Sequence, residues 1–552
     1  MAKITVFKAK RIHTMDPGRP TADAIAVMDG RIVSTGTIET MEPWLSRYEY
    51  EINESLSNKI ILPGFIDPHT HLASTAQFMS LCYIGPIDNP SPDDGNNAVT
   101  TIEDVIATLR RADREETDPD KPLVAWGLDP ANHGGSVDRK ILDGISTTRP
   151  IWVITYAPHI VYLNSLAIKK SKIDPDVEMN GVMRDEQGRL TGVFAELEAM
   201  SYAMAGMGRI LAQQDVGEGL WKMGKIALAS GITTTADMLF GIRHYGAELA
   251  AHKKTVEHPD YPLRMGMVLA EMKLNSIHGD KSAAFIKEQS KEDTEKLFIC
   301  GVKFVTDGSF PAMSLRLNFP GYLDGSIGLK NNVPWEELTD RMMQFWDAGI
   351  PIHCHANGDE AIDASLDTLA ELQEHKYRVD HRFTIEHYSI SNQMQARRLK
   401  TLGGLASVNN YFAHYRSLLH SKEGYGPDRS EAVARLGTLE REGVIFALHS
   451  DFGLVVVPMH PLTAVWVAVN RVAEDGKTVV APGERISVER AMRAITIDAA
   501  YVLGLEERMG SLEPGKLADF TILEEDPYEV DPMRIKDIKI WGTVLSGRLQ
   551  KA

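Results

Sequence analysis

Cysteine is scarce in this sequence: only three occur in 552 residues, Cys82, Cys300 and Cys354. A small odd number does not support a framework of disulfide bonds and is typical of a protein in a reducing cytoplasm. Long apolar runs are also absent, since no segment approaches the roughly 18 residues that a membrane-spanning helix needs. The first ten residues are broken by lysines and lack the apolar core of a secretory signal. We therefore expect a cytoplasmic protein without membrane association.

Basic residues are too few for a nucleic-acid surface. The chain has 59 Lys and Arg against 76 Asp and Glu, and its formal net charge is −17. Binding to a polyanion requires clustered Lys and Arg, so we expect no nucleic-acid partner and attribute the negative charge to solubility. What remains is an ordinary globular composition, 43% hydrophobic and 24% charged. We expect a small molecule as the partner, and a homodimer is left open.

Both ends of the chain are rich in β-forming residues. Alternating apolar residues and turn signals predict strands at residues 3–8, 24–35, 518–523 and 538–545. The second of these stretches contains an Asp-Gly pair, which is typical of a hairpin turn. Because the two β-rich ends flank a long middle, we predict one small β-sandwich assembled from residues 1–61 and 506–552.

The middle of the chain alternates strand-like and helix-like patterns, the signature of repeated βα units and a parallel sheet. Eight strands are predicted, at residues 61–67, 232–238, 263–270, 299–305, 350–355, 383–387, 404–409 and 444–450. Helices are predicted between them, for example at residues 335–348, 359–375, 392–401 and 487–504. Eight strands are what a (β/α)8 TIM barrel requires, so residues 62–505 are predicted to form one. The fold class is therefore α/β.

One connection in this predicted barrel is far too long. The stretch from about 80 to 215 exceeds what a single crossover needs and contains strand patterns of its own, at residues 123–127 and 151–156. We predict an inserted α/β subdomain after the first barrel strand.

The first predicted barrel strand ends in polar residues. The apolar segment Pro63-Gly64-Phe65-Ile66 is followed by Asp67, His69 and His71. The two histidines are two residues apart, so their side chains point to the same face of a strand and both can ligate one ion. Neutral imidazoles are good zinc ligands, and Asp67 is expected to orient one of them by accepting its other N–H. Taken alone the pair is weak evidence, because two such histidines can simply be hydrogen-bonded to neighbours.

A lysine, Lys303, lies near the end of another apolar strand. A buried ammonium group is disfavoured by desolvation, and nearby cations would repel it. Reaction of the amine with CO2 would remove both problems, because the resulting carbamate is an anion whose two oxygens can bridge two metals. The alternative is an ordinary lysine paired with Asp307 or another carboxylate.

Three more strand ends carry candidate ligands. His355 and His387 each end an apolar strand where a loop begins; singly either is more often a structural histidine, but at successive strand ends they indicate a second ion. Asp451 closes the series, and its carboxylate could touch a metal and accept a proton from water. Its alternative role is a helix N-cap. Cys354 alternates with His355, so we expect it on the opposite strand face in a buried apolar role.

These motifs resemble those of the amidohydrolase superfamily, and most closely the YtcJ-like metal-dependent hydrolases of amidohydrolase family 3, which include N-substituted formamide deformylase. The resemblance spans nearly the whole chain. It is carried by Pro63-Gly64-Phe65-Ile66-Asp67-Pro68-His69-Thr70-His71, Gly301-Val302-Lys303-Phe304, Asp307-Gly308-Ser309, His355-Ala356-Asn357-Gly358-Asp359, Ile385-Glu386-His387, Ser450-Asp451 and Gly510-Ser511-Leu512-Glu513-Pro514-Gly515-Lys516-Leu517-Ala518-Asp519.

The resemblance implies a (β/α)8 barrel with a β-sandwich, an insertion after the first strand, and hydrolysis of amide or related C–N bonds by metal-activated hydroxide. It implies two divalent ions, zinc being the expected metal. The ligands would be divided between the two ions, with a carboxylated Lys303 between them. One ion would be held by His69, His71 and Asp451, and the other by His355 and His387. The catalytic residue would be Asp451, which would pass a proton to the leaving amine.

Other residues are expected near the substrate. Within the insertion, Trp126 lies in a segment that resembles the family, and so does His159, although the family usually has Gly where this chain has Pro158. His159 could contact the substrate carbonyl, with a structural role as the alternative. After the seventh strand the family tends to have a Gln-Pro pair, whereas this chain has Asn409-Asn410. Substrate specificity is therefore expected to differ from that of the relatives.

Three competing functions are compatible with these residues. Ester or lactone hydrolysis requires the same nucleophile. Deamination of a cyclic amidine commonly shows His-x-x-Glu after the fifth strand, whereas this chain has Gly358 three residues after His355. A binding or regulatory protein that keeps the fold without turnover is expected to lack a ligand, and every candidate ligand is present. We therefore favour a hydrolase acting on an N-acyl or N-formyl amine.

Overall fold

The structure is a computed structural model. It describes residues 3–79, 81–87, 98–118, 121–156, 160–207, 216–330, 334–455 and 457–552, with only the backbone described at residues 196–198. The chain divides into two compact units. The first contains Met1–His71, Gly224–Asp451 and Met459–Ala552, and the second contains Leu72–Met223 and Phe452–Pro458. Among the described residues, no helix has both the length and the apolar character needed to cross a membrane.

The first unit is built on a parallel sheet of eight strands, in the order β19-β18-β17-β16-β15-β14-β13-β6. The strands are β6 (Phe65–Thr70), β13 (Ile232–Phe240), β14 (Arg264–Ala270), β15 (Leu297–Val305), β16 (Ile352–Ala356), β17 (Thr384–His387), β18 (Leu405–Val408) and β19 (Phe446–Leu448). The two outer strands are joined just beyond the end of β19, where the amide of Asp451 donates to the carbonyl of His69 at 2.9 Å. The sheet is therefore a nearly closed barrel.

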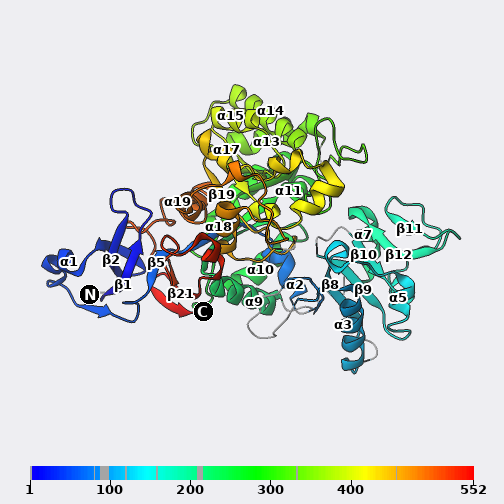
Figure 1. Ribbon diagram of the computed structural model, residues 1–552, viewed down its shortest axis with the longest axis horizontal. Coiled ribbons are helices and arrows are strands. Elements are labelled where there is room, and N and C mark those ends of the chain that lie inside the picture. The colour runs from blue at the N-terminus through cyan, green and yellow to red at the C-terminus, as the bar shows by residue number, and fades with distance from the viewer. Residues whose placement is uncertain are drawn as a thin grey trace. The chain divides into compact units, whose positions relative to one another are not determined.

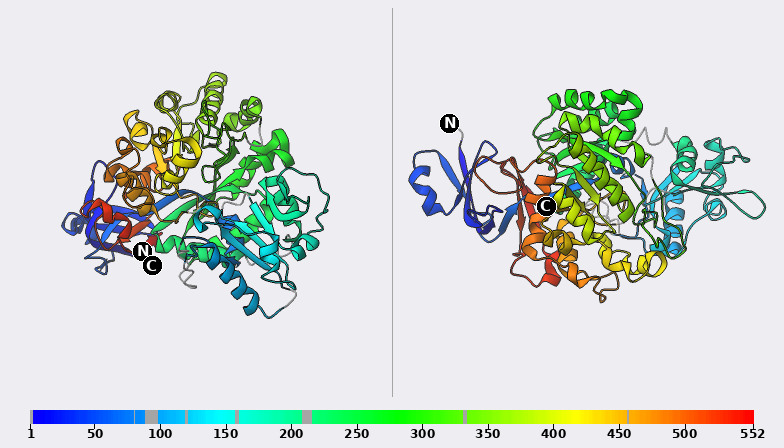
Figure 2. Two further views of the ribbon diagram at one scale, coloured as in Figure 1. Left: turned by 45° about the vertical axis from the view of Figure 1, so that its right-hand side comes forward. Right: turned by 90° about the horizontal axis from the view of Figure 1, so that it is seen from above.

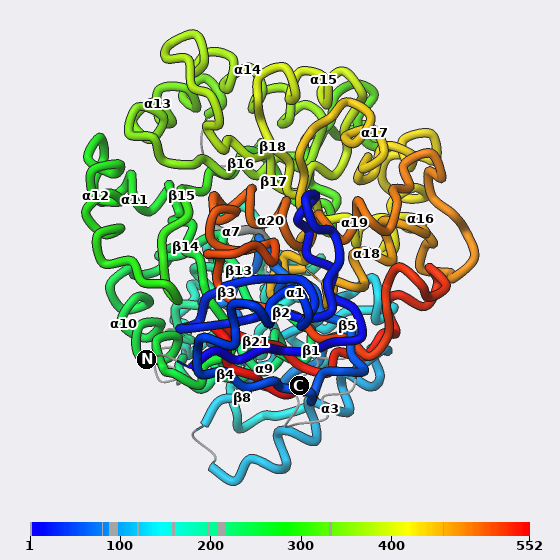
Figure 3. Tube along the Cα trace, turned by 90° about the vertical axis from the view of Figure 1, so that its left-hand side faces the viewer, coloured from blue at the N-terminus to red at the C-terminus, as the bar shows by residue number. Residues whose placement is uncertain are grey.

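Helices surround this sheet (Figure 3). They are α9 (Val216–Ala229), whose first residues belong to the second unit, α10 (Tyr245–Val256), α11 (Glu271–His278), α12 (Ser282–Gln289), α13 (Leu338–Ala348), α14 (Asp359–His375), α15 (Gln393–Thr401), α16 (Ser417–His420), α17 (Leu436–Arg441), α18 (Pro461–Asn470), α19 (Val488–Ala494) and α20 (Ile497–Val502). In α14 the buried residues Ile362, Leu366 and Leu369 recur every three or four positions, so they share one face. Covering helices explain why nearly every residue of these strands is buried.

Two elements predicted from the sequence are each divided in the structure. The strand expected at residues 61–67 is broken at Gly64 into β5 (Ile60–Pro63), which pairs with β20 outside the barrel, and β6. A Cβ at Gly64 would lie 2.0 Å from Oγ1 of Thr233, so only glycine allows this close approach. The helix expected at residues 487–504 is divided into α19 and α20, because the carbonyl of Ile495 accepts from the amide of Ile66 at 2.9 Å and so leaves the helical pattern.

The two ends of the chain share a second sheet in the first unit, in the order β22-β21-β20-β5-β1-β2-β3, with β4 beside β1 (Figure 2). Its strands are β1 (Ile4–His13), β2 (Thr21–Met28), β3 (Arg31–Gly36), β4 (Tyr50–Asn53), β5, β20 (Phe520–Leu523), β21 (Ile540–Leu545) and β22 (Arg548–Lys551). The strands of the two ends are joined through β5, which bonds both β1 and β20. Helix α1 (Ile38–Leu45) contributes Met41 and Leu45 to one apolar cluster.

A buried ion pair ties this terminal sheet to the barrel. Nε of Arg264, the first residue of β14, lies 2.7 Å from Oδ2 of Asp519, and Nη2 lies 3.1 Å from Oδ1. Both side chains are almost fully buried, with 0% and 3% exposed. The amide of Ser546 also donates to Asp519 at 2.8 Å. One carboxylate thus joins a barrel strand, the chain entering β20 and the turn after β21.

The second unit has its own sheet, in the order β11-β12-β10-β9-β8-β7 (Figure 1). The strands are β7 (Cys82–Tyr83), β8 (Leu123–Leu128), β9 (Ile151–Thr155), β10 (Ile160–Leu163), β11 (Val182–Arg184) and β12 (Leu190–Ala195). Its helices include α2 (Leu72–Phe78), α3 (Ile102–Glu115), α4 (Pro130–His133), α5 (Arg139–Asp143), α6 (Ser165–Lys170) and α7 (Glu196–Met204). Buried Val105 and Leu109 of α3 pack against β8 and β9 in a separate apolar core.

We predict that Asp519→Ala destabilises the first unit by about 3–5 kcal/mol, because it leaves the guanidinium of Arg264 buried without its carboxylate. Chemical unfolding, followed through the shift in midpoint, measures this effect. The matched control is Asp260→Ala, which removes an exposed partner of Arg548 2.7 Å away and should change stability by less than about 1 kcal/mol. Equal effects of the two substitutions would contradict the role assigned to the buried pair.

Candidate metal centre

Three candidate ligands from opposite ends of the sequence meet where the barrel sheet closes. His69 lies in β6, His71 follows it, and Asp451 follows β19; they are 1%, 3% and 6% exposed. Oδ1 of Asp451 lies 3.4 Å from Nε2 of His69 and 3.0 Å from Nε2 of His71. Two ligands of a tetrahedral zinc ion at about 2.1 Å each lie about 3.4 Å apart. The separations therefore suit one ion among the three side chains.

Backbone conformation aims Asp451 at the histidines. Asp451 has φ of 59°, a left-handed value that non-glycine residues rarely adopt. Hydrogen bonds fix the preceding residue, Ser450. Its amide and its hydroxyl donate to the carboxylate of Asp67, at 3.2 and 2.5 Å. The carbonyl of Ser450 accepts from Nδ2 of Asn409 at 3.0 Å. Such conformations persist only where the surroundings enforce them, and they concentrate at functional sites.

Glu386 orients His69, which corrects the role expected for Asp67. Oε2 of Glu386 lies 2.6 Å from Nδ1 of His69, and Oε1 lies 2.7 Å from Nδ1 of His353. Asp67 instead bonds Ser450. Burial by itself would raise the pKa of Glu386, but Lys303 and His69 hold that pKa well below its usual value. An ionised carboxylate only accepts hydrogen bonds, so Nδ1 of His69 carries a proton and Nε2 is the ring nitrogen left for a metal.

Lys303 is a buried lysine at a strand end of the barrel. It lies in β15 and is 3% exposed, and among the described residues no group forms a hydrogen bond with its Nζ. The pairing with Asp307 that we considered is not observed. Asp307 accepts instead from the backbone amides of Asn357 and Gly358, at 2.9 and 2.8 Å. Burial lowers the pKa of Lys303, which favours the neutral amine.

The other two candidate ligands face one another. The ring centroids of His355 and His387 are 4.4 Å apart, and that of His387 is 4.7 Å from that of His69. Nε2 of His355 lies 3.1 Å from the carbonyl oxygen of Gly308 and 3.0 Å from Nδ2 of Asn357. Burial lowers the pKa of His355 to about 3, and burial with neighbouring His355 and His69 lowers the pKa of His387 well below its usual value. Both imidazoles are therefore neutral, as ligation requires.

One histidine of this centre was not singled out in the sequence. His449 comes just after β19, is 1% exposed, and has its ring centroid 4.4 Å from that of His69. His69, His387 and His449 form a second set of potential ligands, beside His69, His71 and Asp451. The available signal was the spacing, since His449 and Asp451 are two residues apart, as His69 and His71 are.

The remaining predicted site residues are not among the candidate ligands. Asn409 is fully buried and holds the turn before Asp451. Trp126 belongs to the second unit, where its ring lies 5.0 Å from that of Tyr83 and 5.7 Å from that of Tyr156. His159 lies outside the described residues. Cys354 is buried on the opposite face of β16, with Sγ 3.3 Å from the hydroxyl of Ser365 in α14, so it faces away from the centre.

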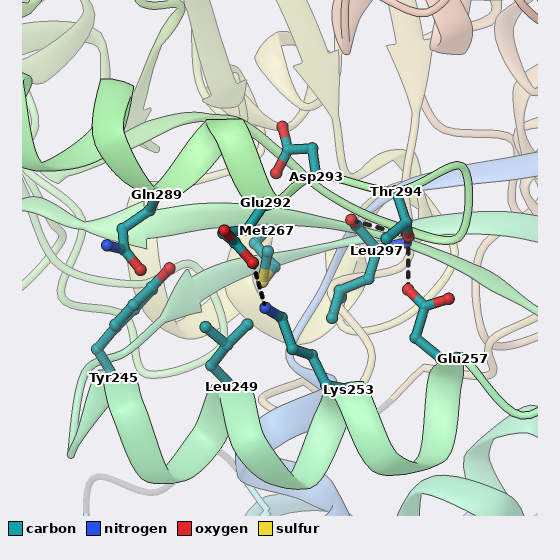
Figure 4. Close-up of a pocket in the computed structure, with 10 residues that line it drawn as sticks. All are labelled: Tyr245, Leu249, Lys253, Glu257, Met267, Gln289, Glu292, Asp293, Thr294 and Leu297. Atoms are coloured by element: carbon teal, nitrogen blue, oxygen red, sulfur yellow. Dashed lines mark hydrogen bonds and ion pairs between the residues drawn. The ribbon is translucent and has the colours of Figure 1, made fainter.

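A separate hollow lies at the beginning of the barrel strands rather than at their ends. Its lining includes Tyr245, Leu249 and Lys253 from one face of α10, and Leu297, the first residue of β15 (Figure 4). Nζ of Lys253 lies 3.5 Å from the carboxylate of Glu292 across it. No candidate ligand lines this hollow. The chemistry of the chain is therefore not expected there.

Comparison with known proteins identifies the family. The amidohydrolase family model matches residues 54–549, so the chain belongs to the amidohydrolase family, and the resemblance seen in the motifs is confirmed. Over 540 residues it is 27% identical to protein LONG AFTER FAR-RED 3 of Arabidopsis thaliana, covering 94% of this chain and 86% of the relative. It is 24% identical to N-substituted formamide deformylase of Arthrobacter pascens over 567 residues, covering 98% and 96%.

A solved structure shares the fold. It is described as an uncharacterised metal-dependent hydrolase from Pyrococcus horikoshii, and it superposes with a TM-score of 0.73 at 21% sequence identity. The match covers 96% of this chain and 99% of that chain. Identity this low supports the shared fold and carries no argument about substrate.

Because Glu386 fixes the tautomer of His69, we predict that Glu386→Gln weakens zinc binding about 10–100-fold, as loss of a group that orients a ligand typically does. Zinc affinity by competition with a chelator measures it. The control is Glu506→Gln, which removes a carboxylate paired with Arg382 at 2.6 Å outside the centre. Zinc affinity equal to that of the unaltered chain, in a folded Glu386→Gln variant, would show that the carboxylate does not support ligation.

Proposed function

We propose that this chain is a metal-dependent hydrolase that cleaves the C–N bond of an N-acyl or N-formyl amine. The observation that carries the proposal is the buried Nζ of Lys303, which has no hydrogen-bond partner among the described residues and lies on a barrel whose strand ends carry His69, His71, His355, His387 and Asp451. An unpaired buried amine is costly. Carboxylation would remove this cost, because it would turn the amine into a negatively charged metal ligand.

The donor set fits two divalent ions. His69, His71 and Asp451 would hold one, and His355 and His387 the other, with the carbamate of Lys303 between them. For the carbamate, the lone pair of neutral Nζ forms a bond to the carbon of CO2 and a proton is released. Neutral imidazoles with few carboxylates favour zinc over magnesium or calcium. When bound, such ions lower the pKa of water to about 7 and polarise a carbonyl.

Asp451 is the proposed proton carrier. Burial would raise its pKa, but His69 and His71 hold that pKa far below its usual value, so the carboxylate is ionised at neutral pH. Its Oδ1 can therefore accept a proton from the attacking water and return it to the leaving nitrogen. The left-handed turn and the bonds to Ser450 fix the direction of this carboxylate.

The choice of an amide-type bond is supported by two observations. A relative that spans nearly the whole chain is an N-substituted formamide deformylase. Moreover, the position where a cyclic-amidine deaminase would carry its glutamate is occupied by Gly358, and a Cβ there would lie 1.8 Å from the carbonyl oxygen of Arg316. A carboxylate side chain at this position is therefore sterically excluded.

Turnover of a substrate panel with and without added zinc tests this function. The panel contains N-formyl amines, N-acyl amino acids, dipeptides, lactones and cyclic amidines. We expect zinc-dependent release of amine from the acylated or formylated amines. Faster lactone opening with no amine release would replace the proposal by ester chemistry, and no turnover of any compound by the zinc-loaded chain would favour a binding or regulatory role.

For Lys303→Ala we predict joint loss of metal and turnover, because the substitution removes the shared ligand. The metal content measured by elemental analysis should fall below two ions per chain. Short carboxylates such as acetate should restore part of the metal content and part of the turnover by occupying the vacated space. Lys296→Ala is the control, since Lys296 lies outside the centre and bonds the carbonyl of His258 at 2.7 Å. A Lys303→Ala variant that keeps both ions and normal turnover would contradict the carbamate.

A further inference from the structure

The part of the centre that the proposed function leaves unused is His449. Its ring is buried between those of His69 and His387, with centroid distances of 4.4 and 5.2 Å. His449 is not needed as a proton carrier, because Asp451 has that role in the proposed function. A fully buried imidazole among metal-binding residues needs its own explanation.

Hydrogen bonding determines which ring nitrogen of His449 is available. Its Nδ1 lies 2.7 Å from the hydroxyl of Ser407 and 3.7 Å from Oε2 of Glu386. A hydroxyl that can accept and a nearby carboxylate both favour the proton on Nδ1. The lone pair of His449 is then on Nε2, on the side of the ring that faces His387.

The separation between these two histidines is the distance expected of ligands. Nε2 of His449 lies 3.3 Å from Nδ1 of His387, and two nitrogens bound to one tetrahedral zinc ion at about 2.0–2.1 Å lie about 3.4 Å apart. One ring nitrogen each of His69, His387 and His449 lie within 4.8 Å of one another. In His69 the free nitrogen is Nε2, because Glu386 occupies Nδ1.

We propose that His449 is a metal ligand, contributing Nε2 to a neutral three-histidine set with His69 and His387. The proposal rests on the proposed function only in requiring that an ion is bound. His69 also belongs to the set with His71 and Asp451, and His387 to the set with His355, so the three-histidine set shares its ion with one of these sets or alternates with it. Three nitrogen donors favour zinc, cobalt or nickel over magnesium or calcium.

The competing explanation is that His449 only accepts a hydrogen bond from Nδ1 of His387. Zinc affinity separates the two, because loss of a group that merely orients a ligand costs about 10–100-fold. We expect His449→Gln to weaken zinc binding by more than about 100-fold. The matched control is His252→Gln: His252 is also fully buried, but it bonds the carbonyl of Glu248 within α10 at 2.7 Å, and its loss should leave zinc affinity unchanged.

Anomalous diffraction from zinc-soaked crystals of the unaltered chain decides the question without a substitution. We expect an ion about 2.0–2.1 Å from Nε2 of His449. A loss of affinity below about 100-fold in a folded His449→Gln variant, or an ion bound by the other ligands and beyond about 3 Å from this nitrogen, overturns the proposal. A chain that holds zinc on His449 but cleaves nothing in the panel contradicts the proposed function alone. Amide cleavage with the ion away from His449 contradicts this inference alone.

Discussion

Glu386 is a carboxylate with no exposed surface, placed among histidines at the ends of the barrel strands. A charge at that depth is stable only when neighbouring groups donate hydrogen bonds to it. His69 and His353 do so through Nδ1, and the arrangement of the centre depends on these two bonds. With Nδ1 of His69 occupied, Nε2 is directed at Asp451, and the same carboxylate biases His449 toward a proton on its own Nδ1. One buried anion therefore determines which nitrogen of His69 is left for a metal and biases that of His449.

The backbone of the loops at the strand ends also directs side chains into the centre. His387 and Asp451 both have left-handed backbone angles, with φ of 73° and 59°, although neither is glycine. Each costs roughly 1–3 kcal/mol unless the surroundings enforce it. Around Asp451 this enforcement comes from Asp67, Ser450 and Asn409, none of which is a proposed ligand. The hydrogen bonds among these three residues offset the cost of the left-handed turn, and the turn directs the carboxylate of Asp451 into the centre.

The rigidity needed to hold such a centre comes from the way the chain ends join the barrel. β5 leaves the terminal sheet and becomes β6 after a single glycine, Gly64, so the strand that carries His69 is anchored at its beginning. The Arg264–Asp519 pair adds a second connection, from β14 to the C-terminal strands. Residues at the two extremes of the sequence thus position the strands between them.

The sequence by itself determined the strands, the candidate ligands and the family. Apolar runs bounded by turns are local signals, and all eight barrel strands lie within a few residues of the predicted ranges. The i, i+2 spacing of His69 and His71 is a property of any strand. Only the tertiary structure decided that Glu386, and not Asp67, orients His69, and that His449 joins the centre. It also decided that Nζ of Lys303 forms no hydrogen bond with any residue in the described part of the chain. His69 and Glu386 are 317 residues apart in the sequence, and side chains that distant meet only because successive strands close into a barrel, which no local pattern encodes.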